Sequence, residues 1–94
     1  MKRKNEDAVT LKLSKQIADE IAPLVDTLGL SPEAAIQCAL VVSAMRVGVY
    51  KTKAAYVKAI RESERMFKVK LMKHMPPYVK GGDPKYIEEL KGLA

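Results

Sequence analysis

The feature that most constrains this 94-residue chain is an alternating stretch near its start, residues 8–13. Its apolar members are Val9, Leu11 and Leu13, and the others are Ala8, Thr10 and Lys12. Successive side chains of a strand point to opposite faces, so this alternation predicts a short β-strand with one apolar face. The backbone N–H and C=O groups of a strand need partners, and the rest of the sequence offers no second strand. We therefore expect the strand to pair with its copy in a homodimer.

Charge points to the kind of partner. The chain holds 17 Lys and Arg against 11 Asp and Glu, a net charge of +6. Such a balance favours a polyanion, either nucleic acid or an anionic membrane surface. The single cysteine, Cys38, excludes an intrachain disulfide and suits a reducing cytoplasm, which we expect to be its location. The longest apolar run, residues 34–45, is too short to cross a bilayer, so we expect no membrane span.

Two helices are predicted after the strand. Ser14 is a good N-cap, and a stripe at spacings of three and four follows it: Ile17, Ile21, Leu24 and Leu28. Gly29 ends this first helix. Ser31 and Pro32 then start a second one, as N-cap and first helical residue, which runs to about Arg46 or Val47.

The second helix is apolar on two sides, which predicts burial almost all round. One side carries Ile36, Ala39, Leu40 and Val47, and we expect it to pack on the first helix and the dimer mate. The other side carries Cys38, Val42 and Met45. We expect a third helix, through Tyr56, Ile60 or Phe67, or another dimer, to cover that side.

The C-terminal half predicts a long basic helix at about residues 53–75. After a hinge at Gly81 and Gly82, it predicts a short helix at about 84–93 with Asp83 as its N-cap. Residues 46–80 hold ten Lys or Arg and two acids, so the positive charge is concentrated there. One helix face forms a basic ridge: Lys58, Arg61, Arg65 and Lys68. Three interpretations stay open for this ridge, namely contact with a DNA backbone, docking of an acidic partner, and a merely solvated face.

Residues 8–47 resemble the ribbon-helix-helix family, and most closely its CopG-type repressors and antitoxins. The resemblance rests on the run from Val9 to Ser14, the amphipathic helix, Gly29-Leu30-Ser31, and the run from Ala34 to Leu40. It implies a mainly α fold, in which one N-terminal strand pairs across a homodimer and two helices follow. The domain would span residues 8–48, with a flexible basic arm at 1–7 and a helical extension at 49–94.

The resemblance also implies site residues. The paired strands would enter the major groove of DNA, with Ala8, Thr10 and Lys12 facing the bases. Leu30 and Ser31 would bind a phosphate, although Ser31 is equally explained as a helix cap. Lys2, Arg3 and Lys4 of the arm either contact phosphates or are solvated. The dimer core would comprise Val9, Leu11, Leu13, Ile36, Leu40 and Val47.

The sequence thus predicts a homodimeric, sequence-specific DNA-binding protein, a transcriptional repressor or copy-control regulator. The alternative is an antitoxin-type interaction module whose residues 49–94 bind a partner protein. The two differ in whether residues 51–94 fold onto the core or stay disordered until a partner binds. Assembly of dimers into larger species is open. We expect no enzyme, cofactor or metal site, since the sequence has no glycine-rich phosphate loop, nucleophile–base pair or ligand cluster.

Overall fold

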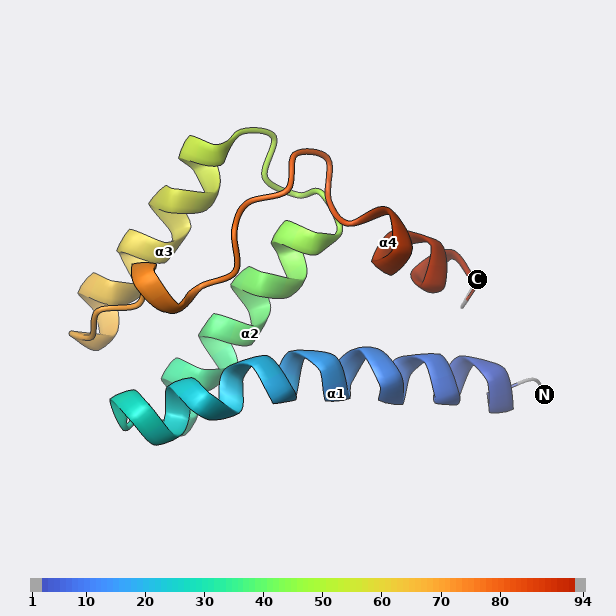
Figure 1. The fold of residues 1–94 in the computed structure, drawn as a ribbon, viewed down its shortest axis with the longest axis horizontal. Coiled ribbons are helices and arrows are strands. Elements are labelled where there is room, and N and C mark those ends of the chain that lie inside the picture. The colour runs from blue at the N-terminus through green and yellow to red at the C-terminus, as the bar shows by residue number, and fades with distance from the viewer. Residues whose placement is uncertain (1–2, 93–94) are drawn as a thin grey trace.

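The computed structural model describes residues 3–92, with side chains from Ser14 onward. This part of the chain forms four α-helices and one 3₁₀ turn: α1 (Arg3–Leu28), α2 (Pro32–Arg46), α3 (Lys53–Phe67), η1 (Met72–His74) and α4 (Pro84–Lys91). Helix α1 lies along one edge of the molecule, and α2 leads away from its C-terminal end to α3 (Figure 1). The chain then returns along α3 and α2 and ends in α4, above the N-terminal half of α1.

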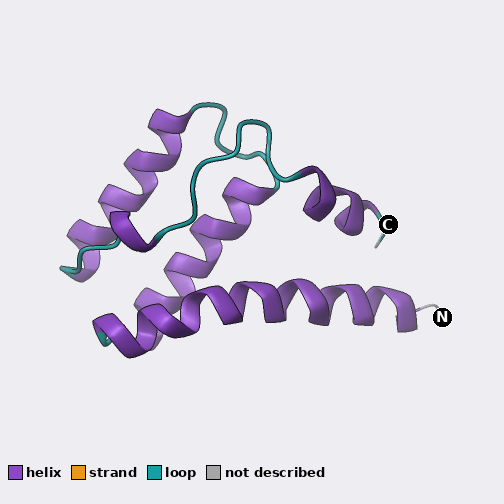
Figure 2. Cartoon of the chain, viewed as in Figure 1, coloured by secondary structure: helices purple, strands orange, loops and turns teal. Residues whose placement is uncertain are grey.

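The predicted ribbon-helix-helix fold is wrong, because residues 3–92 contain no strand (Figure 2). Residues 8–13 lie inside α1, and Ser14 is an interior residue of that helix rather than its N-cap. A helix satisfies its backbone N–H and C=O groups within its own segment, whereas a lone strand cannot. The sequence pattern also permits a helix, since Val9 and Leu13 stand at four-residue intervals before Ile17. Residues 3–7, expected as a flexible arm, form the first turns of α1.

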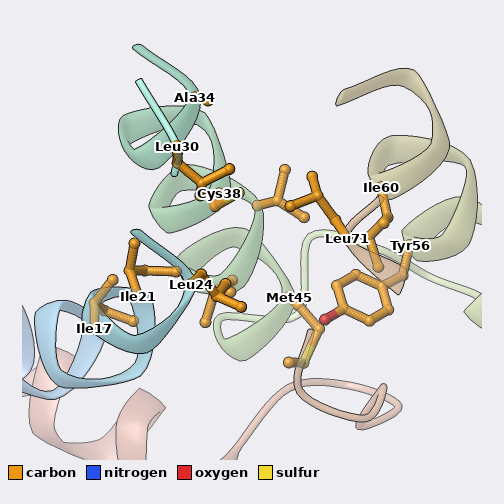
Figure 3. Packing of buried hydrophobic residues seen from close by; sticks show 12 residues of the cluster. Ile17, Ile21, Leu24, Leu30, Ala34, Cys38, Met45, Tyr56, Ile60 and Leu71 are labelled. Carbon is orange, nitrogen blue, oxygen red and sulfur yellow. The ribbon is translucent and has the colours of Figure 1, made fainter. Parts of the chain in front are cut away.

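The core lies where α2 crosses between α1 and α3 (Figure 3). From α1 it receives Ile17, Ile21 and Leu24, which confirms the predicted apolar stripe of that helix. Cys38, Val42 and Met45 are at most 1% exposed and pack in one cluster with Tyr56, Ile60 and Leu71. The prediction that the third helix covers this side of α2 is therefore confirmed.

The starts of α2 and α4 agree with their predicted caps. The Ser31 hydroxyl accepts a hydrogen bond from the Ala34 N–H at 3.2 Å, and Pro32 is the first helical residue. The Asp83 carboxylate accepts from the Lys85 N–H at 3.0 Å. Each cap satisfies one backbone donor that the first turn of a helix leaves unpaired.

Helix α3 ends at Phe67, eight residues before the predicted end near Met75. Lys68 takes the left-handed conformation, with φ 55°, and its N–H still donates to the Glu64 carbonyl. Beyond it, the Glu64 carboxylate accepts hydrogen bonds from the backbone N–H groups of Leu71 and Met72. These N–H groups are thereby satisfied by a side chain instead of by further helical turns, so the chain folds back on α3.

Tyrosine side chains fix the returning segment, residues 68–83. The Tyr56 hydroxyl donates to the Pro76 carbonyl at 2.6 Å, and the Tyr78 hydroxyl donates to the Tyr50 carbonyl at 2.7 Å. The rings of Tyr50 and Tyr78 both lie within 6 Å of the Tyr56 ring, at 5.7 and 5.8 Å between centroids. On α4, the Tyr86 hydroxyl lies 3.2 Å from the hydroxyl of Ser43 on α2.

Candidate nucleic-acid interface

The C-terminal half of α3 and the segment after it enclose a groove of about 940 Å³, hereafter the basic groove. Five Lys and Arg side chains line it, together with one histidine and one glutamate: Arg61, Arg65, Lys68, Lys70, Lys73, His74 and Glu64. The early end of α3 creates this arrangement, because the chain after Phe67 runs back beside the helix (Figure 1). Lys68, Lys70 and Lys73, which a continuous helix would spread around its axis, thus line the same groove.

Glu64 neutralises little of this positive charge, because its carboxylate already has hydrogen-bond and ion-pair partners. One oxygen pairs with the Arg61 guanidinium at 2.9 Å, and the other accepts from the N–H groups of Leu71 and Met72. Burial alone would raise the pKa of Glu64, but the two backbone hydrogen bonds and Arg61 outweigh it and hold the pKa below 4.5. The remaining groove cations therefore face solvent with their charge largely uncompensated.

Three of the four residues of the predicted ridge line this groove, namely Arg61, Arg65 and Lys68. Lys58, Arg61 and Arg65 occupy successive turns of α3, on the side opposite the buried Tyr56 and Ile60, and all three are exposed. Neighbours at such spacings lie about 5–6 Å apart at their β-carbons. Lys68, also exposed, follows at the end of the helix. Arg61, Arg65 and Lys68 thus belong both to the ridge and to the lining of the groove, and Lys58 extends the ridge along α3.

Aromatic side chains are missing from this surface. The described lining of the basic groove includes no Phe, Tyr or Trp. Three tyrosine hydroxyls are used inside the fold, those of Tyr56, Tyr78 and Tyr86. Binding of single-stranded nucleic acid relies on aromatic rings on which bases stack. The groove offers charge without such a stacking platform.

The predicted base-reading positions lie elsewhere and lose their common face. Ala8, Thr10 and Lys12 belong to α1, whose residues turn by about 100° each, so position 10 is far around the helix from positions 8 and 12. The predicted strand is therefore wrong, whereas contact of these three residues with DNA bases stays a prediction. Of the predicted arm, Arg3 and Lys4 also belong to α1, and Lys2 lies outside the described residues.

Leu30 and Ser31, the predicted phosphate clamp, both have structural roles, and phosphate binding there stays a prediction. Leu30 is buried in the core, and Ser31 caps α2 through its hydroxyl. Of the two interpretations that the sequence left open for Ser31, the structure displays the cap.

The predicted dimer core has two members that remain uncovered in one chain. Ile36 and Leu40 are 60% and 59% exposed, while Val47 is half-buried. The side chains of Val9, Leu11 and Leu13 precede Ser14 and are outside the described side chains.

The sequence did not predict Lys70, Lys73 and His74 as companions of the ridge. The available signal was the concentration of ten Lys and Arg in residues 46–80, but a helix continuing to Met75 distributes these side chains around its axis. Within residues 3–92, no group of three His, Cys, Asp or Glu side chains converges as a metal site. Nor do the helices of this range include one with the length and apolar character needed to cross a membrane.

Comparison with protein-family models, with curated proteins and with solved structures finds no match to this chain. The resemblance of residues 8–47 to the ribbon-helix-helix family therefore stays a prediction, and no family is assigned.

Proposed function

We propose that this protein is a DNA-binding regulator that holds double-stranded DNA by its phosphates in the basic groove. One observation carries the proposal: five Lys and Arg side chains converge on a groove whose glutamate is committed to Arg61 and to backbone N–H groups. Duplex DNA carries about one negative charge per 1.7 Å of its axis, and neutralising these charges releases condensed counterions. A dense cationic surface is the feature that such binding requires.

Double-stranded DNA is favoured over single strands by the side chains present. Arg and Lys recognise phosphate oxygens, and Arg does so with two parallel donors. The groove lacks the aromatic rings that single-strand binders use, as described above. Transcriptional or copy-number regulation is the role that we propose for this binding. A cytoplasmic location, where the buried thiol of Cys38 stays reduced, belongs to the same proposal.

The antitoxin alternative is less well supported. It requires a C-terminal half that stays free until a partner protein binds. Residues 53–92 instead pack on α2, with Tyr56, Ile60 and Leu71 at most 3% exposed and Tyr86 bonded to Ser43. Their apolar side is thus used within the chain, and what they leave exposed is mostly charge.

The test compares two variants with the same loss of charge. The groove variant replaces Arg65, Lys68, Lys70 and Lys73 with Gln. The control replaces Lys51, Lys53, Lys80 and Lys85, which are exposed outside the groove, with Gln. Affinity for a labelled duplex is measured by fluorescence anisotropy at one salt concentration. Exposed charge pairs contribute about 0.2–1 kcal/mol each, so the loss of four should make the groove variant bind about fourfold to several hundredfold more weakly than the control.

Three results would contradict the proposal. Equal affinities of the two variants would show that overall charge, and not the groove, governs binding. Absence of binding by the wild-type protein would remove the function itself. Tighter binding of a single strand than of its duplex would assign a different ligand.

A further inference from the structure

A second groove, almost wholly apolar, lies on the side of α2 away from α3, between α1, α2 and α4. Its volume is about 600 Å³. Residues from all three helices line it: Ile17 and Ile21, Ile36 and Leu40, Tyr86 and Leu90. Ile36 and Leu40 are the most exposed of these, at 60% and 59%, although both are large and apolar. Large apolar side chains gathered on one surface mark an interaction site more often than a solvated face.

The dimensions of the chain show that it buries less of its surface than a compact monomer of the same mass does. Its accessible surface is 6297 Å², whereas a compact monomer of 10.4 kDa exposes about 5,400 Å². Its radius of gyration is 14.0 Å, against about 12 Å for a compact domain of this length. The excess of about 900 Å² is summed over the whole chain, and it exceeds the roughly 800 Å² that each partner buries in a standard interface.

The lining of the groove is suited to a second copy of itself. Beside the large Ile36 and Leu40 stand small residues, Ala18 on α1 and Ala35 and Ala39 on α2. Under a two-fold axis, the same patch on each copy meets its counterpart. Ile36 and Leu40 of one copy then fill the space above the alanines of the other, in the manner of side chains that interdigitate between helices.

Charge also permits two copies to meet here. Every described residue that lines this groove is uncharged at pH 7. Residues 1–45, which supply α1 and most of α2, hold five Lys or Arg and six acids, while the strongly positive residues 46–80 include the basic groove. Two copies joined through this face therefore approach without the like-charge repulsion that the basic surface would impose.

We propose that the apolar groove between α1, α2 and α4 is the interface of an isologous homodimer, with Ile36 and Leu40 at its centre. The dimer forms whether or not DNA is present, so its test does not depend on the proposed function.

The experiment uses two double variants with similar exposure of the replaced side chains and equal added charge. One replaces Ile36 and Leu40 with Glu, and the control replaces Val49 and Met66, which are 58% and 66% exposed outside the groove, with Glu. Sedimentation equilibrium from about 1 to 100 μM should give a dimer for the wild-type chain and for the control. The groove variant should sediment as a folded monomer, with its dissociation constant raised at least about 100-fold. Circular dichroism establishes that it keeps its helices.

A crosslinking variant keeps the proposal testable if the charged variant fails to fold. Leu40→Cys in a Cys38→Ala background places a single thiol at the expected centre of the interface. Mild oxidation should link two chains through it, whereas Met66→Cys in the same background should not. A wild-type monomer throughout the concentration range would overturn the proposal and leave the groove to a different protein. Dimers that persist in the Glu variant, or crosslinking at Met66→Cys alone, would overturn it as well.

Discussion

The Glu64 carboxylate accepts a hydrogen bond of 2.7 Å from the backbone N–H of Leu71, seven residues further along the chain. A second, from Met72, is 3.0 Å long. These two bonds hold the chain folded back against α3 and thereby bring Lys70 and Lys73 beside Arg61 and Arg65. The basic groove thus depends on an acidic residue.

Glu64→Ala should destabilise the protein by about 1–3 kcal/mol, since it leaves partly buried backbone donors unpaired. The free energy of unfolding is measured in urea at pH 7. Glu62→Ala, which removes the same charge from an exposed neighbour, should change it by less than about 0.5 kcal/mol. Equal effects of the two variants would mean that the bonds from Glu64 do not stabilise the fold.

Glu64 should also contribute to the pH dependence of stability. Its folded pKa is lower than 4.5, the ordinary value, so near pH 4 the unfolded chain binds more protons than the folded one. Its contribution is fully present above pH 4.5 and is lost as the pH falls through the folded pKa. The stability difference between wild type and Glu64→Gln should therefore shrink on acidification below pH 4.5. A constant difference would contradict this role of the carboxylate.

The helix ends that the sequence predicted most accurately are those marked by a capping residue or by a glycine. Ser31 and Pro32 start α2 and Asp83 starts α4, as predicted, because a capping side chain acts on the backbone next to it. Gly29, with φ 65°, ends the first apolar stripe for a similarly local reason. Local chemistry of this kind can be read from a sequence.

The wrong predictions turned on hydrogen bonds that a pattern of residues does not show. In residues 8–13 alternation suits a strand, but Val9 and Leu13 also extend the helical stripe that includes Ile17. Hydrogen bonding then decides, since a helix needs no partner segment. The end of α3 has no glycine or proline that would predict it. The helix ends there because the Glu64 carboxylate binds a backbone N–H seven residues further on, and no periodicity of the sequence reveals such a bond. The basic ridge was found from the sequence, whereas the groove behind it required the reversal at Lys68.

Val42→Asp should cost at least about 3 kcal/mol of stability, because Val42 is 0% exposed and the new carboxylate has no partner there. Val49→Asp introduces the same side chain at a position that is 58% exposed, so it should be nearly neutral. Thermal unfolding followed by circular dichroism compares the two. A Val42→Asp protein that melts like the wild type would disprove the packing of α2 against α3.

Gly82→Ala should destabilise the protein more than Gly81→Ala by about 1–3 kcal/mol. Both glycines have positive φ, 90° and 78°, so both alanines incur left-handed strain. At Gly82, an added β-carbon would lie 2.6 Å from the Arg46 carbonyl oxygen and 2.7 Å from the Gly48 nitrogen. At Gly81 it would meet nothing within 4 Å. Urea unfolding of both variants checks the difference, and equal losses would contradict the close approach of these backbones.

Tyr56→Phe should remove the last tyrosine to ionise in alkaline titration. Burial, supplemented by Tyr50 and Glu20 and opposed by Arg46, raises the pKa of Tyr56 to about 12. Since the ordinary value is 10.0, its hydroxyl stabilises the fold fully below pH 10, and this contribution is lost as the pH rises towards 12. Tyrosinate absorbance should lose its component near pH 12 in the variant. Its persistence would assign that pKa to another tyrosine.

The salt dependence of duplex binding tests the central claim, phosphate contact by the basic groove, most directly. The logarithm of the association constant is measured against the logarithm of salt concentration for the wild type and for the variant with Gln at Arg65, Lys68, Lys70 and Lys73. Each lost phosphate contact should reduce the steepness of the line by about 0.9, so four contacts reduce it by about 3–4. An unchanged slope, with the variant folded, would contradict the claim that these side chains contact the DNA backbone.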